Sequence, residues 1–175
     1  REYDDRTDQY VGDEIKRIGW IGDEKVGARK MHAFFELHIE QGPILEAEGK
    51  DIGVVTHGQG LNWLQVTLRG RESHTGSTPM PMRLNAGLGM ARITELVHTI
   101  AMENQPDAVG AIGHCEVHPN SRNVIPGKCV FTIDFRSPSF STQEKMENQL
   151  REGAKAIISE LNLEMEIEKV GHFDP

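Results

Sequence analysis

The stretch Lys128-Cys-Val-Phe-Thr-Ile-Asp-Phe-Arg136 decides the fold that this sequence predicts. Apolar side chains recur at every second position from Cys129 to Phe135, and most positions between them are polar. Because successive side chains of a strand point to opposite faces, this period of two predicts a strand with one buried face. Such a strand needs other elements over its apolar face, so the neighbouring segments decide the architecture.

The segments on both sides of this strand alternate between helical and strand periodicity. The order from Leu61 to Val170 is β-α-β-β-α-β, and Ser141-Thr-Gln-Glu144 matches a capping box at the start of the second helix. We therefore predict an α+β fold, a ferredoxin-like antiparallel sheet with two helices on one face. The elements expected around 128–136 are helices over 84–103 and 141–161 and strands over 63–69, 109–117 and 163–170.

The composition indicates a folded protein without the charge of a nucleic-acid binder. The 175 residues are 37% hydrophobic and 26% charged, which suits a packed core, and the formal net charge is −8. A general nucleic-acid binder would show a basic patch instead. The acidic charge therefore argues against nucleic acid as a partner. No apolar run approaches the roughly 20 residues of a membrane span, so we do not expect a membrane as partner either. The two cysteines, Cys115 and Cys129, form no CxxC pair, which favours a reducing, cytoplasmic location.

A second alternating stretch, Phe35 to Gln41, carries the first residues suited to chemistry. A strand here places Glu36, His38 and Glu40 on one face. A histidine among carboxylates suits a metal ion or an acid–base pair. Spacing alone favours the alternative, an ordinary half-buried histidine satisfied by a neighbouring carboxylate. One strand also cannot supply the three or four ligands that a zinc ion needs.

His74 is the second candidate, in a loop of small residues between a strand and a helix. Such a loop lets a side chain project from a rigid scaffold towards a ligand. An imidazole placed there is able to donate a hydrogen bond to a developing oxyanion. Spacing alone again favours the plainer alternative, a surface histidine in a loop.

The third group is Asn123 in the turn 120–127, with Arg136 at the end of the central strand. An amide and a guanidinium suit a ligand with a carboxylate and an amide-like group. The alternatives are that Asn123 forms the turn and that Arg136 is a solvated strand end. Arg136 falls on the face opposite the apolar side chains of its strand, so it is not expected in the core.

These three groups also form a combined signature, in this order along the chain. Its segments are Glu36-Leu-His-Ile-Glu-Gln-Gly-Pro43 with Glu46, then Ser73-His-Thr-Gly-Ser-Thr-Pro-Met80, then Pro119-Asn-Ser-Arg-Asn-Val-Ile-Pro-Gly127 with Asp134-Phe-Arg136. Together they resemble the zinc-dependent amidohydrolases that cleave N-carbamoyl groups, within the M20 metallopeptidase-like superfamily. That family includes N-carbamoyl-L-amino-acid hydrolases, β-ureidopropionases and allantoate amidohydrolases.

The resemblance implies a role for each candidate. His38 matches a ligand of one of two catalytic metal ions, zinc by family default, with manganese, cobalt or nickel as substitutes. His74 matches a histidine that reaches the partner subunit's active site and stabilises the tetrahedral transition state. Gln41, Asn123 and Arg136 match substrate-binding residues, with the arginine on the substrate carboxylate. The reaction implied is attack of metal-activated hydroxide on the ureido carbonyl of an N-carbamoyl amino acid, with a glutamate as general base.

The resemblance also implies how the chain is divided. Residues 1–49 would be a fragment of an α/β catalytic domain, 50–170 an inserted lid or dimerisation domain, and 171–175 the return to the catalytic domain. The family's other metal ligands and its general base lie in motifs absent from this sequence, so we expect the isolated chain to be inactive. The chain begins without Met and ends abruptly, which also suggests a piece of a longer protein. The lid implies a homodimer.

A reading without chemistry stays open beside these. Domains of the β-α-β-β-α-β type also serve as dimerisation or amino-acid-sensing modules, and a fold does not by itself fix a function. Within the enzymes, an allantoate amidohydrolase or a β-ureidopropionase is the alternative to an N-carbamoyl-L-amino-acid hydrolase.

Overall fold

The computed structural model describes residues 3–4 and 9–175 of the chain, which divides into two compact units, Arg1–Gly53 and Val54–Pro175. The part of the predicted fragment 1–49 that falls on residues 1–2 and 5–8 lies outside the described residues. Each unit is described by itself below.

The second unit is built on a four-stranded antiparallel sheet in the order β5-β7-β3-β8. This is the strand order of a ferredoxin-like sheet, so the predicted fold is confirmed. β7 lies in the middle, paired with β3 from Arg69↔Lys128 to Gly60↔Ser137 and with β5 from Val109↔Arg136 to His118↔Lys128. The four strands are β3 (Gly60–Arg69), β5 (Val109–His118), β7 (Lys128–Ser137) and β8 (Glu164–Phe173).

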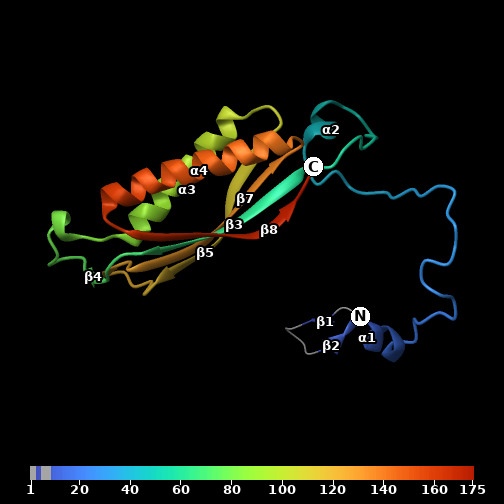
Figure 1. Ribbon diagram of the computed structural model, residues 1–175, viewed down its shortest axis with the longest axis horizontal. Helices are drawn as coiled ribbons and strands as arrows, with labels where there is room; N and C mark the ends of the chain where they lie inside the picture. The colour runs from blue at the N-terminus through green and yellow to red at the C-terminus, as the bar shows by residue number, and fades with distance from the viewer. Residues whose placement is uncertain (1–2, 5–8) are drawn as a thin grey trace. The chain divides into compact units, whose positions relative to one another are not determined.

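Two long helices, α3 (Ala86–Glu103) and α4 (Phe140–Leu161), cover one face of this sheet (Figure 1). The inward residues of β7 alternate with outward ones as the sequence predicts, and Phe131, Ile133 and Phe135 are fully buried. Both helices turn an apolar stripe onto the sheet, as amphipathic helices do. The core also contains Leu64, Val66 and Leu68 of β3, Ile93, Val97 and Ile100 of α3, and Met146, Leu150 and Ala154 of α4.

The start of α4 differs from the predicted capping box. The helix begins at Phe140, and its N-cap is Ser139, whose side chain accepts a hydrogen bond from the Thr142 backbone N–H. Ser141 therefore lies inside the first turn, where its hydroxyl meets that of Ser139 at 3.0 Å. At the other end Asn162 closes the helix in the left-handed conformation, with φ 50°.

The first unit has little regular structure in its described part. It contains a short ribbon, β1 (Tyr3–Asp4) with β2 (Gln9–Tyr10), and two short helices, α1 (Val11–Arg17) and α2 (Ile44–Ala47). The strand predicted over 35–41 is wrong, because no described segment pairs with this stretch and a strand needs a hydrogen-bonded partner. Its apolar side chains are exposed, 93% for Phe35 and 99% for Leu37.

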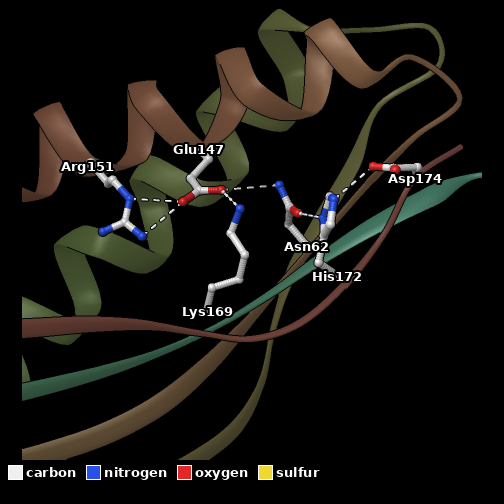
Figure 2. A network of polar contacts seen from close by, with 6 residues as sticks. All are labelled: Asn62, Glu147, Arg151, Lys169, His172 and Asp174. Carbon is white, nitrogen blue, oxygen red and sulfur yellow. Dashed lines mark hydrogen bonds and ion pairs between the residues drawn. The ribbon is translucent and has the colours of Figure 1, made fainter.

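A network of polar side chains ties α4 to β3 and β8 at the end of the sheet where the second unit begins and ends (Figure 2). Glu147 of α4 is at its centre, with Oε2 2.7 Å from Lys169 Nζ and Oε1 2.9 Å from Arg151 Nη2. Asn62, which is 2% exposed, meets His172 Nδ1 at 2.5 Å through its Oδ1. Burial raises the pKa of Glu147, but hydrogen bonds from Lys169 and Arg151 outweigh it and hold that pKa below its ordinary value of 4.5.

We predict that Glu147→Gln lowers the free energy of unfolding by about 1–2 kcal/mol at neutral pH. Since the folded-state pKa of Glu147 is lowered, its stabilisation is present above the unfolded pKa of 4.5 and disappears as the pH falls through the folded-state value. The difference between variant and wild type should therefore shrink to nothing in strong acid. Denaturant unfolding curves at several pH values measure it.

Glu160→Gln on the same helix is the control, since that carboxylate is 65% exposed and, among the described residues, forms one ion pair, with Arg92. Its loss should stay within about 0.5 kcal/mol at every pH. A Glu147→Gln difference that is independent of pH would contradict the assigned ion pairs.

Candidate functional site

His74 lies on a small two-stranded ribbon at the end of the sheet where β7 begins (Figure 1). The ribbon pairs β4 (Ser73–His74) with β6 (Val124–Ile125), with His74 opposite Val124. The Gly70 backbone N–H donates to the Gly127 carbonyl at 2.7 Å, which fixes the ribbon to the sheet. Gly127 is required by this close approach, since a Cβ there would lie 2.7 Å from the Glu72 backbone nitrogen. Part of the segment predicted as loop is therefore a strand.

The His74 ring is held by the turn that follows it. Its Nδ1 lies 3.1 Å from the backbone nitrogens of both Gly76 and Ser77 and 3.2 Å from Ser77 Oγ. Arg83, half-buried, holds the same turn through hydrogen bonds to the carbonyls of Thr75 and Thr78, at 2.7 and 3.0 Å. An exposed imidazole on a braced turn suits hydrogen bonding to a ligand.

Asn123 stands beside this turn. Its backbone carbonyl accepts from the Thr75 N–H at 3.0 Å, and its Oδ1 accepts from the Ser121 hydroxyl at 2.9 Å. Because Oδ1 already accepts this hydrogen bond, the Nδ2 hydrogens of Asn123 are suited to donate to a ligand. The structure thus brings two of the predicted site residues, His74 and Asn123, into one cluster, the ribbon cluster.

Arg136 forms a close pair with Asp134 on the face of the sheet away from the helices. The guanidinium donates from Nη2 to Asp134 Oδ2 at 2.8 Å and from Nε to both carboxylate oxygens at 3.1 Å. The hydrogen bond with Asp134 raises the pKa of Arg136 above its ordinary value. No role was predicted for Asp134, although its spacing of two from Arg136 on a strand indicates a shared face.

The ribbon cluster and Arg136 lie at opposite ends of the sheet. The β7 register places Lys128 at the ribbon end and Arg136 eight positions further along, opposite Leu61. At about 3.4 Å per residue this separation is about 27 Å along the strand. A small substrate therefore cannot contact His74 and Arg136 of the same chain at once.

The first unit holds the two other predicted site residues, His38 and Gln41. His38 Nε2 lies 2.5 Å from Glu36 Oε1, and both side chains are exposed. Glu40 has a structural role, because its carboxylate accepts from the backbone N–H groups of Ile44 and Leu45 at the start of α2. Gln41 adopts the left-handed conformation, φ 55°, which is uncommon outside glycine and marks a constrained position.

The described residues do not complete a metal site. In the described part of the chain no three His, Cys, Asp or Glu side chains come together in a way that could hold a metal ion. His114, Glu116 and His118 lie in a row on β5, but they too are not arranged to hold a metal ion. The hydrogen bond from His114 lowers the pKa of Glu116 below its ordinary value. The donors around His38 therefore do not by themselves fit the zinc pair that the resemblance implies.

Comparison with known proteins accounts for this architecture. The model of the peptidase dimerisation domain of M20 proteins matches residues 56–162. The chain belongs to this M20 dimerisation-domain family. The match covers most of the ferredoxin-like unit.

Individual relatives carry names from one group of amidohydrolases. An N-carbamoyl-L-amino-acid amidohydrolase of Rhizobium meliloti is 65% identical over 94% of this chain and 39% of its own length. The allantoate amidohydrolase of Escherichia coli is 38% identical over 78% of this chain and 33% of its own. A crystal structure of a hydantoinase/carbamoylase family amidase from Burkholderia multivorans matches with a TM-score of 0.88 and 46% identity, over 96% of this chain and 41% of that protein.

The chain thus spans about two fifths or less of the length of these relatives. The M20 amidohydrolases hydrolyse C–N bonds and are metal-dependent as a family. In the part of the chain that the structure describes, no helix combines the length and apolar character needed to cross a membrane.

We predict that the purified 175-residue chain, stripped with a chelator, shows no saturable zinc binding in the micromolar range. The reason is that no described cluster can hold a metal ion, and His38 has a single neighbouring carboxylate, Glu36, where a tight site needs three or four ligands. Calorimetric titration measures it, with His38→Ala as the matched variant. Two tightly held ions per chain, or a loss of tight binding in His38→Ala, would contradict this placement of the ligands.

Proposed function

We propose that this chain is the lid and dimerisation part of a metal-dependent amidohydrolase that cleaves the carbamoyl C–N bond of N-carbamoyl-L-amino acids. The observation that carries the proposal is the similarity of nearly the whole chain to proteins of that name. We use the term parent enzyme for the full-length protein that contains this chain. Residues 1–49 are assigned to its catalytic domain and 50–170 to the lid. The last strand of the lid, β8, runs on to Phe173, so the return within 171–175 begins where that strand ends.

The exposed apolar side chains of the first unit support this division. Trp20, Val26 and Leu37 are 82, 97 and 99% exposed, and neither described helix of the unit has a buried residue. Leaving such side chains in water forfeits about 1.5–3 kcal/mol each relative to burial. A catalytic domain of the parent enzyme would supply the missing contacts, together with the remaining ligands of a zinc pair to which His38 contributes.

The second unit's residues then have distinct tasks. The His74 imidazole donates a hydrogen bond to the carbonyl oxygen that gains charge during hydrolysis, which is worth several kcal/mol when the donor is preorganised. Arg136 binds the substrate carboxylate, and Asp134 holds the guanidinium from one side so that its other edge faces the ligand. Asn123 donates from its amide to the ureido group, and Gln41 contacts the substrate from the first unit.

A homodimer that pairs through β5 would place His74 of one chain near Arg136 of the other, although the two residues lie far apart within one chain. β5 and β8 are the two edges of the sheet, and β8 carries three glutamates where β5 carries one. Charged side chains protect a strand edge from pairing, so β5 is the edge open to a second copy.

The two unpaired cysteines, of which Cys129 is buried, suit the reducing cytoplasm in which such an enzyme would work.

Two-fold symmetry then brings the two clusters together. In an antiparallel pairing of β5 with its copy, the His118 end of one strand lies beside the Val109 end of the other. The ribbon cluster is at the His118 end, and the partner's Arg136 is opposite the partner's Val109. The partner's β7 is then two strand spacings away from β5, about 10 Å. Each site of the dimer takes His74 from one chain and Arg136 from the other.

We predict that the isolated chain hydrolyses no N-carbamoyl amino acid, while His74→Ala in the parent enzyme lowers kcat about 10²- to 10³-fold with little change in KM. His98→Ala is the control, since that exposed histidine lies on α3 away from the ribbon. Steady-state kinetics with several N-carbamoyl and ureido substrates, allantoate included, measures both claims. Turnover by the isolated chain, or an unchanged kcat in His74→Ala, would contradict the assignment.

We further predict that His74→Ala and Arg136→Ala chains of the parent enzyme complement each other. Random mixing makes half of the dimers mixed, and each mixed dimer has one site with both residues intact, so roughly a quarter of wild-type activity returns. Refolding or co-expression with two purification tags measures it.

The matched control mixes wild type with the double variant. Sites shared between chains leave only wild-type dimers active, roughly a quarter, whereas sites within one chain leave roughly a half. No complementation in the first mixture together with half activity in the second would contradict the shared site.

The second candidate is an assembly or amino-acid-sensing module without chemistry. The plain ferredoxin-like architecture of the second unit favours it, because the same sheet and helices serve such modules. A module would lose no catalytic rate on substitution of His74, so the kinetic experiment above separates the two.

A further inference from the structure

The hydrogen-bonding environment of the His74 ring is unusual for an exposed histidine. Two backbone N–H groups, of Gly76 and Ser77, both approach Nδ1 at 3.1 Å, and the Ser77 hydroxyl is 3.2 Å from the same atom. Within the described residues no hydrogen bond involves Nε2 of this ring. The hydrogen bonds of the imidazole to the described residues are therefore all at Nδ1.

These contacts determine where the ring hydrogen lies. A backbone N–H can only donate, so Nδ1 must accept through its lone pair. A neutral imidazole carries one hydrogen, which is then on Nε2. The Ser77 hydroxyl, which is able to rotate, also donates to Nδ1.

We propose that the turn 74–77 fixes His74 in the Nε2–H tautomer, and that Ser77 and Arg83 are the positioning residues that aim this hydrogen at the substrate oxygen. The role of the hydrogen rests on the proposed function, whereas the tautomer follows from the turn alone. In this state neither ring nitrogen offers a free lone pair. His74 is then a hydrogen-bond donor to an oxyanion and is neither a metal ligand nor a general base.

The sequence around His74 fits this device. Gly76 leaves space for the ring, since a Cβ there would lie 3.1 Å from His74 Cε1 and 3.5 Å from Nδ1. The Thr78 N–H donates to the His74 carbonyl at 3.1 Å and closes the turn. Arg83 then holds the turn from outside through the carbonyls of Thr75 and Thr78. The loop motif thus combines a small residue, a hydroxyl and a distant arginine around one ring.

Nitrogen NMR of ¹⁵N-histidine-labelled chain tests the tautomer directly. The spectrum is recorded at about pH 9, where histidines are neutral, and the His74 signals are identified by their loss in His74→Gln. The expected result is a pyridine-type Nδ1 and a pyrrole-type Nε2. Averaged signals, or a pyrrole-type Nδ1, would overturn the proposal.

Two substitutions test the positioning role of Ser77. Ser77→Ala should move the Nδ1 resonance further towards a nitrogen without a hydrogen bond, while Ser77→Thr should leave it unchanged. Ser121→Ala is the control, since its hydroxyl bonds Asn123 in the neighbouring turn. An Nδ1 signal that Ser77→Ala does not move would overturn the role of the hydroxyl.

Kinetics of the parent enzyme tests what the tautomer is for. Ser77→Ala should lower kcat about fivefold at constant KM, the effect of one neutral hydrogen bond, and Ser77→Thr should restore it. The Nε2–H tautomer without any carbamoyl hydrolysis would refute the proposed function and leave the assignment of the tautomer intact. Carbamoyl hydrolysis by an enzyme whose His74 is in the Nδ1–H tautomer would refute the assignment of the tautomer and leave the proposed function intact.

Discussion

The packing of β7 against α3 and α4 is the constraint on which the rest of the structure depends. This central strand buries Phe131, Ile133 and Phe135 on one face, and its hydrogen bonds to β3 and β5 fix the register of both neighbours. At about 1.5–3 kcal/mol for each large side chain removed from water, these three residues anchor both helices. Because helices cover only that face, Asp134 and Arg136 remain accessible on the other.

The same register separates the chemical groups of the second unit. His74 and Asn123 project from the ribbon at one end of the sheet, and Arg136 lies at the other end. A rigid sheet cannot bend to close a gap of about 27 Å, so a second subunit is the physically simple way to bring them together. Under the proposed function, the architecture that makes the lid stable would also make its chemistry dependent on assembly.

Much of this fold could be predicted from the sequence, because strand and helix periods are local properties. The strand over 35–41 was wrong, since alternation cannot reveal whether a partner strand exists. The capping box was misplaced because Ser139 and Ser141 both have cap chemistry two residues apart. The ribbon of His74 escaped prediction because strands of two residues have no period.

For the candidate site, residue type and motif predicted His74, Asn123 and Arg136 as candidates, and this prediction stays untested. The strand register was needed to see which of these residues lie close together. The hydrogen bonds that hold the His74 ring and its turn cannot be predicted from sequence periodicity either. Arg83 is nine positions away from His74, and only the folded turn shows that it holds the carbonyls on either side. Asp134 was within reach of prediction, because a spacing of two on a strand places it beside Arg136.

The shared-site arrangement is tested most directly by a crystal structure of the parent enzyme with zinc and a non-hydrolysable N-carbamoyl amino acid analogue. The arrangement predicts one analogue in contact with His74 of one subunit through Nε2 and with Arg136 of the other subunit through its carboxylate. An analogue held by His74 and Arg136 of the same subunit, or by neither residue, would contradict it.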